Sequence, residues 1–394
     1  MKNRLLVRVV RLLLVVALTL AVLAVKAETV RVSVYSQDKI KTLVFSTEEG
    51  KYSLVADNRL LMRLKKNAII YFTIVGRRVS VWDQDEHLGI FDELYLTAST
   101  KKSIFKIEPA VPAMKPRTYD GDLKVTALGG NLKIENYVDV NDYLSGVVES
   151  EAGPKAPYEY YKTQAIISRT YLYALIWRDG VETYNLMDDV SHQVYLNRCH
   201  RNSIIRQAVS HTTDLIIVDS TNNPISAVFH SNSGGQTANS EDVWLSPLPY
   251  LKSVADTFSI GQHNSVWHDT VSADRWIKYL QDNGIKITDS QSRTDNMAYN
   301  PSSRDRCYRY KTDTLPLKKI RADFGFKSAW FSIKPNGNVL EFTGHGYGHG
   351  VGLSQEGAME MARQNYSFLD IINFYYRNVK VMNIRNISRN VDGK

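Results

Sequence analysis

The chain has 394 residues, of which 43% are hydrophobic and 23% are charged, and its formal net charge is +8. A chain of this length has room for two or three domains with hydrophobic cores of their own. Five of the Lys and Arg residues lie in residues 1–27, which contain no acidic residue, so the rest of the chain carries only about +3. Nucleic-acid binding requires a concentrated basic face, and this composition therefore argues against a nucleic-acid partner.

Residues 1–27 have the pattern of a secretory signal peptide. A basic start is followed by an apolar run over residues 12–25, and Val25-Lys26-Ala27 then offers small residues at the two positions that a signal peptidase reads. This run is shorter than the ~20 residues that cross a bilayer as a helix. We expect cleavage after Ala27, export to the periplasm or the cell wall, and a mature chain that is not an integral membrane protein. An uncleaved signal anchor is the alternative.

Residues 28–112 have the pattern of a small β-rich region. Apolar and polar residues alternate at 30–34 and at 79–81, and residues 68–75 form a run rich in β-branched and aromatic side chains. Three of the eleven prolines fall within residues 109–117, which is typical of a linker. The region contains no convergent set of catalytic side chains.

Residues 113–385 combine strands and helices without a regular alternation. Strands are predicted at 123–127, 132–137, 214–219 and 225–230. A helix is predicted over 157–178, and a capping box at Ser367–Asp370 predicts a second helix that ends near Tyr376. The first helix has a predicted buried stripe of Tyr161, Ala165, Ser168, Leu172 and Leu175. We therefore predict an α+β fold, in which a mixed, strand-rich domain follows the small β-rich region.

The stretch 344–358, GHGYGHGVGLSQEGA, contains six glycines. His345 and His349 are spaced as in a helical zinc motif, but glycines surround both histidines and the Glu of that motif is absent. A phosphate-binding loop also fits poorly, because a glycine pattern without a preceding strand is weak evidence. We favour a loop in which glycines with positive φ let a ligand approach the backbone, while His, Tyr, Ser and Gln side chains hydrogen-bond a polyhydroxylated substrate. A tight structural turn is the alternative.

Two acidic residues, Glu149 and Glu151, precede the predicted helix at 157–178. On an extended backbone they would share a face, whereas on a helix they would diverge. Apolar residues before them and the rigid Gly153-Pro154 turn after them provide partly apolar surroundings. Burial of this kind raises the pKa of a carboxyl group and suits it to act as a general acid.

Two further stretches carry polar side chains of possible function. Residues 230–256 place Gly234-Gly235 and Gln236 after a predicted strand and before Trp244, which is consistent with a polar cleft that has an aromatic wall. A serine nucleophile is disfavoured because the G-x-S-x-G motif is missing. His192, Cys199 and His200 could bind zinc or form a Cys–His nucleophile, and Cys199 could instead pair with Cys307.

Together these stretches resemble the SpoIID/LytB family, and the resemblance extends over residues 115–380. The first matching block comprises Tyr143-Leu144, Gly146-Val147-Val148, Ser150-Glu151, Lys162, Gln164-Ala165 and Arg169-Thr170-Tyr171. The second comprises Ser231, Gly234-Gly235, Thr237, Trp244, Tyr250-Leu251, Val254 and Asp256. The third comprises Gly346, Gly348-His349-Gly350-Val351-Gly352, Ser354-Gln355 and Gly357-Ala358.

The resemblance implies a lytic transglycosylase that cuts peptidoglycan between N-acetylmuramic acid and N-acetylglucosamine, on strands stripped of stem peptides. It places the catalytic acid at Glu151, with Glu149 as the second choice. It implies no cofactor, and we assign no metal. Its partner would be the glycan strand, and a cell-wall amidase stays open as a second partner. The implied substrate-binding residues are Arg169, Tyr171, His230, Ser231, Gly234, Gly235, Gln236, Trp244, Tyr347, His349, Ser354 and Gln355.

Two other functions stay open at this point. The chain could be a non-catalytic wall-binding protein that enhances an amidase, as the enhancer branch of the family suggests. It could also be a zinc-dependent wall amidase that uses His192, Cys199 and His200. For domains, we predict a signal peptide at 1–27, a β-rich region at 28–112 and a SpoIID-like domain at 113–385.

Overall fold

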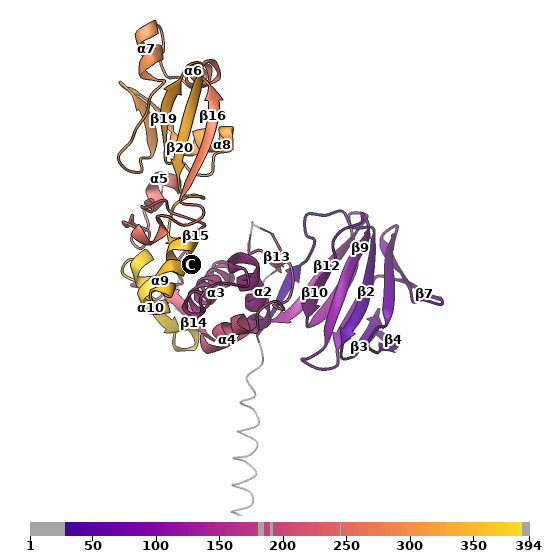
Figure 1. The fold of residues 1–394 in the computed structure, drawn as a ribbon. Helices are drawn as coiled ribbons and strands as arrows, with labels where there is room; N and C mark the ends of the chain where they lie inside the picture. Colours follow the sequence, from indigo (N-terminus) through magenta and orange to yellow (C-terminus); the bar gives the residue numbers. More distant parts are fainter. Residues whose placement is uncertain (1–27, 180–184, 190–191, 245, 388–394) are drawn as a thin grey trace, which may run out of the picture. The chain divides into compact units, whose positions relative to one another are not determined.

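A computed structural model of the chain describes residues 28–179, 185–189, 192–244 and 246–387 (Figure 1). The predicted signal peptide lies outside these ranges. The chain divides into two compact units: the residues up to 116 together with 120–140, and residues 117–119 together with those from 141 onward. Strands and helices are both abundant, which confirms the predicted α+β class.

The first unit is a sandwich of two antiparallel sheets. Within the unit, one sheet has the order β1 (Thr29–Ser33), β12 (Asn131–Asp139), β11 (Asp122–Leu128), β8 (Glu93–Ala98), β3 (Tyr52–Ala56) and β4 (Arg59–Leu64). The other has the order β9 (Ile104–Val111), β2 (Thr42–Glu49), β5 (Ile69–Val75), β6 (Arg78–Trp82) and β7 (His87–Phe91).

The alternation seen in the sequence explains how these sheets pack. Every second side chain of β2 and β3 is buried, as expected for strands with one face toward a core. The rings of Phe45, Tyr52 and Phe105 join the two sheets, with centroids 5.5–5.9 Å apart. Strands β11 and β12, which the sequence analysis assigned to the second region, belong to this first unit.

The second unit is built around one buried helix, α3 (Tyr158–Asp179), which confirms the helix predicted over 157–178. All five residues of the predicted stripe are buried. The opposite sides of the helix are buried as well, including Ile166, Ile167 and Arg169. The helix is therefore buried on more sides than the predicted stripe alone.

The elements around α3 come from distant parts of the chain. They are α2 (Val140–Ala152), α4 (Ser203–His211), α9 (Gln355–Arg363), α10 (Phe368–Tyr375), and the paired strands β14 (Leu215–Val218) with β22 (Lys380–Asn383) and β15 (Phe229–His230) with β21 (Leu353–Ser354). Shorter elements are β10 (Arg117–Asp120), β13 (Asn185–Met187), α5 (Ser240–Trp244), and the 3-10 turns η1 (Thr257–Ser259) and η2 (Ile384–Asn386).

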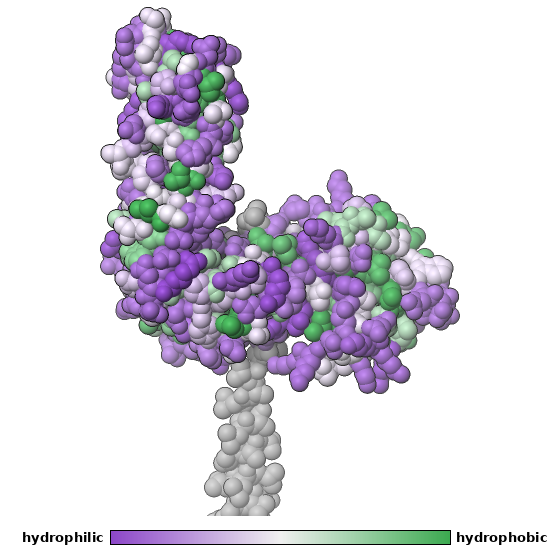
Figure 2. All heavy atoms as spheres, viewed as in Figure 1, coloured by the Kyte–Doolittle hydropathy of each residue, from purple (hydrophilic) through white to green (hydrophobic). Residues whose placement is uncertain are grey.

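A second hydrophobic core within this unit belongs to the segment from β16 to β20, which we call the β16–β20 subdomain. Its antiparallel sheet has the order β16 (Val266–Ser272), β20 (Val339–His345) and β19 (Phe331–Asn336). Its remaining elements are α6 (Ala273–Asp282), α7 (Ser290–Asp295), β17 (Cys307–Tyr310), β18 (Asp313–Pro316) and α8 (Leu317–Phe324). Trp276 is fully buried at the centre. Figure 2 shows mostly hydrophilic residues on the visible face of this subdomain.

Most local predictions in the second region agree with the structure, and one needs correction. The strands at 123–127, 132–137 and 214–219 and the capped helix after Ser367 are confirmed. Of the strand predicted at 225–230, only Phe229–His230 is a strand. The segment that holds Glu149 and Glu151, for which the sequence left an extended and a helical backbone open, is helical. In the part of the chain that is described, no helix is both long and apolar enough to cross a membrane.

Candidate active site

Helix α2 separates the two glutamates that the sequence places two residues apart. Because consecutive side chains of a helix point about 100° apart, Glu149 and Glu151 face different surroundings. Glu149 points into the protein and is only 2% exposed. Glu151 is half-buried and lines a cavity.

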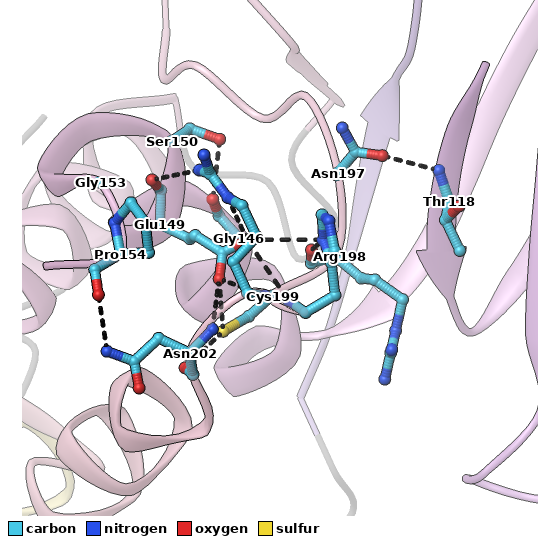
Figure 3. A network of polar contacts seen from close by, with 12 residues as sticks. Thr118, Gly146, Glu149, Ser150, Gly153, Pro154, Asn197, Arg198, Cys199 and Asn202 are labelled. Atoms are coloured by element: carbon cyan, nitrogen blue, oxygen red, sulfur yellow. Dashed lines mark hydrogen bonds and ion pairs between the residues drawn. The ribbon is translucent and has the colours of Figure 1, made fainter.

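Glu149 holds the loop that precedes α4 (Figure 3). Its carboxylate accepts hydrogen bonds from the backbone amides of His200, Arg201 and Asn202, from Arg201 Nε and from the Cys199 thiol. Burial alone would raise the pKa of Glu149, but the donors of Arg201, His200 and Cys199 outweigh it and lower the pKa. Glu149 is therefore an ionised structural anchor, and it is unsuited to donate a proton near neutral pH.

Glu151 has the opposite environment. Burial raises the pKa of its carboxyl group, and a hydrogen bond from the backbone amide of Val194 only partly offsets this effect. A carboxyl group with a raised pKa stays protonated to higher pH, which is the state that a general acid needs.

The cavity that Glu151 lines has a volume of about 560 Å³, within the range of ligand-binding pockets. Of the described residues that line it, Glu151 is the single carboxylic acid. The others are His192, Gln193, Val194, Phe229, His230, Ser231, Arg321, Tyr347, Gly348, His349 and Gln355. The structure thus brings Glu151 together with His230, Ser231, Tyr347, His349 and Gln355 of the predicted site.

The glycine-rich loop forms one wall of the cavity by packing closely on the segment that follows β15. Asn232 and Tyr347 exchange two backbone hydrogen bonds, of 3.1 and 2.8 Å. Gly346 has a φ of 79°, and a Cβ at this position would lie 2.4 Å from the Asn232 carbonyl oxygen. The glycines therefore allow the positive φ and the close backbone approach that the sequence predicts. One segment that makes this close approach is the Asn232 segment of the same chain.

His230 and His349 lie side by side, with ring centroids 5.5 Å apart. His349 Nδ1 accepts a hydrogen bond from the Val351 amide at 3.0 Å, and the Phe229 carbonyl accepts one from the same ring. Burial, the main cause, and the charges of Arg321 and Arg304 lower the pKa of His349 to about 4. His349 is thus neutral at physiological pH and held in one orientation.

His230 offers a hydrogen-bond acceptor. Its Nδ1 lies 3.1 Å from the Val351 carbonyl oxygen and therefore carries the proton. Burial and the neighbouring His349 and Arg304 hold the pKa of His230 well below its usual value. Its Nε2 is buried and has no hydrogen-bond partner among the described residues. A neutral ring in this tautomer presents Nε2 as an acceptor for a ligand hydroxyl group.

Several predicted residues lie behind the cavity instead of lining it. Ser354 caps α9 and accepts hydrogen bonds from the amides of Ser233 and Gly357. Trp244 packs against His349 with centroids 5.0 Å apart. Gly234 and Gly235 form a turn with positive φ values. These residues shape the wall from outside.

Gln236, Arg169 and Tyr171 also stand apart from the cavity lining. Gln236 donates to Ser253 Oγ at 3.1 Å. Arg169 is 1% exposed and donates to the carbonyls of Thr212 and Val209 at the end of α4. Tyr171 lies on α3 and is not among the residues that line the cavity. Arg169 therefore fixes the end of α4, and it does not line the cavity in which a substrate would bind.

The residues of the zinc alternative are divided between two places. Cys199 and His200 lie at Glu149, whereas His192 lines the cavity. Within the described ranges, no group of three or more His, Cys, Asp and Glu side chains is placed to hold a metal ion. Cys199 and Cys307 are not joined in a disulfide.

Arg321, Gln193, Val194 and Phe229 of the cavity were missed as site residues by the sequence analysis. Arg321 comes from α8 of the β16–β20 subdomain, in a stretch without any recognisable motif. Its presence at the site depends on how that subdomain packs, and nothing local in the sequence could have indicated it.

Comparison with known proteins places this architecture in a family. The family described as Stage II sporulation protein, SpoIID, matches residues 129–218, which include α2 and α3. Stage II sporulation protein D of Bacillus subtilis is 31% identical over 266 residues, which cover 64% of this chain and 76% of that protein. The same protein of Bacillus amyloliquefaciens gives the same identity and coverage. The amidase enhancer of Bacillus subtilis is 26% identical over 284 residues, 59% of this chain and 39% of the enhancer. This chain is therefore a member of the SpoIID/LytB family.

Proposed function

We propose that the chain is an exported, cell-wall-acting lytic transglycosylase that cleaves the MurNAc–GlcNAc bond of peptide-stripped glycan strands. Glu151 carries this proposal, because it is the single carboxylic acid among the described residues that line the cavity and burial raises its pKa. A glycosidase that hydrolyses normally needs two carboxyl groups, as acid and as nucleophile or base. A lytic transglycosylase can work with one, since the substrate supplies its own nucleophile.

The reaction would use Glu151 twice. The protonated carboxyl group first donates its proton to the glycosidic oxygen, and the bond between that oxygen and C1 of the muramyl sugar breaks. The 6-hydroxyl group of the same sugar then attacks C1, and the Glu151 carboxylate takes the proton from this hydroxyl. The products are a strand with a new GlcNAc 4-hydroxyl end and a strand with a 1,6-anhydromuramyl end. No water is consumed, and the acid is restored.

The remaining cavity residues suit recognition of a polyhydroxylated ligand. His230 Nε2 is an acceptor, and Gln355 Nε2 is a buried donor without a hydrogen-bond partner among the described residues. Ser231 and Tyr347 add hydroxyl groups at the rim. We assign substrate contacts to these side chains and to His349, and we assign wall-shaping roles to Gly234, Gly235, Gln236, Trp244 and Ser354. Residues 1–27 are proposed as the cleaved signal peptide.

Digestion of peptide-free glycan strands by the wild type and by Glu151→Gln tests this function, with the products identified by mass spectrometry. We expect anhydromuramyl ends from the wild type and a loss of about 10²–10⁴-fold in rate for Glu151→Gln, as for removal of a general acid. The exposed Glu341→Gln is the matched control and should cleave normally. Reducing ends would indicate a hydrolase with a second carboxyl group. Glycan binding without cleavage by either protein would favour the function named in the amidase enhancer relative.

A further inference from the structure

Among the described residues that line the cavity, Arg321 carries the one permanent positive charge. The guanidinium Nε donates to the Phe326 carbonyl at 3.3 Å, and the Phe326 amide donates back to the Arg321 carbonyl at 3.0 Å. Gly325 closes this turn with a φ of 71°. This turn therefore holds Arg321 at the end of α8. It takes up the guanidinium Nε, and the two terminal NH2 groups make no hydrogen bond within the turn.

Arg321 has no acidic partner in the described part of the chain. No carboxylate oxygen of these residues lies within 4.0 Å of its guanidinium, and burial lowers the pKa of the group. Removing a charge from water is costly unless the charge is paired. An unpaired guanidinium that lines a cavity therefore indicates a ligand of opposite charge.

A second arginine adds to the positive potential. Arg304 is partly buried behind the glycine-rich loop, where it donates to the carbonyls of Ser233 and Gln236 at 2.6 and 2.5 Å. It too lacks a carboxylate partner among the described residues. After burial itself, its charge and that of Arg321 contribute to the low pKa of His349. With Glu151 protonated for catalysis, the cavity carries net positive charge and favours an anionic group on its ligand.

The substrate of the proposed function has one such group. The lactyl ether of N-acetylmuramic acid ends in a carboxylate when the stem peptide has been removed, and in a neutral amide when the peptide is present. The planar guanidinium fork matches a carboxylate through two parallel hydrogen bonds. An amide can accept at one oxygen only and lacks the charge, so the site would bind it less tightly.

We propose that Arg321 binds the free lactyl carboxylate of the muramyl sugar and thereby makes the site selective for peptide-free strands. This inference rests on the proposed function, because it takes the glycan strand as the ligand. Arg321 is a specificity-determining residue in this account, and Glu151 remains the residue that moves the proton.

Binding measurements in a Glu151→Gln background test the proposal without requiring cleavage. The two ligands are short peptide-free glycan oligosaccharides and the same oligosaccharides with every lactyl carboxylate converted to a methylamide. By calorimetry we expect Glu151→Gln to bind the carboxylate form about tenfold more tightly than the methylamide form. This factor corresponds to the lower end of the free energies found for hydrogen bonds to a charged group. Adding Arg321→Gln should remove this preference, because it weakens the binding of the carboxylate form only. Adding Arg321→Lys should restore part of it, because charge is kept and the fork is lost.

Lys319→Gln is the matched control, since it removes one positive charge from the exposed side of the same helix. It should leave the preference unchanged. The proposal is overturned if the preference survives Arg321→Gln, if Arg321→Gln weakens both ligands equally, or if neither ligand binds. Should Arg321→Gln fail to fold, equal binding of the two ligands by Glu151→Gln alone is enough to reject the proposal. If the wild type does not cleave glycan but the preference is found and is lost with Arg321, the catalytic proposal fails and this one stands.

Discussion

At the scale of single residues, α2 shows how two identical side chains acquire different chemistry. Glu149 is surrounded by donors that stabilise its charge, whereas the half-buried Glu151 has lost solvent and gains one backbone hydrogen bond. The pKa of the first is lowered and that of the second is raised. Environment, and not residue type, therefore decides which glutamate can act as an acid.

The raised pKa of Glu151 predicts that the wild type is less stable at neutral pH than it would be with a neutral residue there. A carboxyl group whose folded pKa exceeds its unfolded pKa destabilises the fold increasingly as pH rises through this interval. We expect Glu151→Gln to melt at a higher temperature than the wild type at pH 7, and the difference to shrink toward pH 4. Thermal melts at several pH values measure this. A difference that does not change with pH would contradict the assigned ionisation.

The lowered pKa of Glu149 predicts the opposite behaviour. Its stabilising contribution is present above the unfolded pKa and is lost as pH falls through the lower folded value. Glu149→Gln should lower the free energy of unfolding at pH 7 by about 2–4 kcal/mol, because buried amide donors lose a charged acceptor. Denaturant titrations check this against Glu341→Gln, an exposed residue whose replacement should cost under about 0.5 kcal/mol. Equal effects of the two changes would refute the anchoring role.

At the scale of elements, the glycine-rich loop builds the cavity wall through backbone contact. The backbone of Gly346 packs closely on the Asn232–Gly234 segment, and Gly348 lies against His230. The loop thus fixes His230 and His349 from behind, and side chains larger than glycine would separate the two segments.

Gly346→Ala should therefore cost more than backbone strain alone. We expect about 3 kcal/mol or more, since the new Cβ would meet the Asn232 carbonyl at 2.4 Å in addition to the positive φ of 79°. Gly337→Ala is the control, because Gly337 also has a positive φ but no atom lies within 4 Å of its added Cβ. It should cost about 1 kcal/mol. Similar unfolding free energies for the two variants would mean that the loop contact is not tight.

At the scale of the whole molecule, the compact units do not follow the predicted boundary between residues 112 and 113. Strand β12 pairs with β1 and β11, and β11 pairs with β8. Leu123, Val125 and Ile134 of these two strands are buried in the sandwich. The unit is therefore completed by a segment that lies beyond the proline-rich stretch.

This arrangement predicts how fragments will behave. A polypeptide of residues 28–140 should show a cooperative thermal melt, because it contains every strand of the sandwich described above. A polypeptide of residues 28–112 should not, because it leaves β1 without β12, removes β11 from the edge of β8 and uncovers the core. Circular dichroism melts of both fragments compare them directly. A cooperative melt of the shorter fragment would show that β11 and β12 are dispensable.

The features that local interactions control could be predicted from the amino-acid order alone. The buried stripe of α3, the strands at 122–139 and the capped helix after Ser367 follow from periodicity, turn residues and capping, which act over a few residues. The positive φ values of the glycine-rich loop follow likewise from the freedom of glycine. The ordered motifs identified the family before the fold was known.

Which glutamate faces the cavity could not be predicted in this way, because it depends on the helical turn of α2 and on a loop fifty residues away that surrounds Glu149. Tertiary packing alone places Arg169 away from the cavity and brings in Arg321, a residue of α8 in the β16–β20 subdomain. Burial, donor count and the approach of distant chain segments set the charge state and position of these groups. No pattern along the chain records that environment.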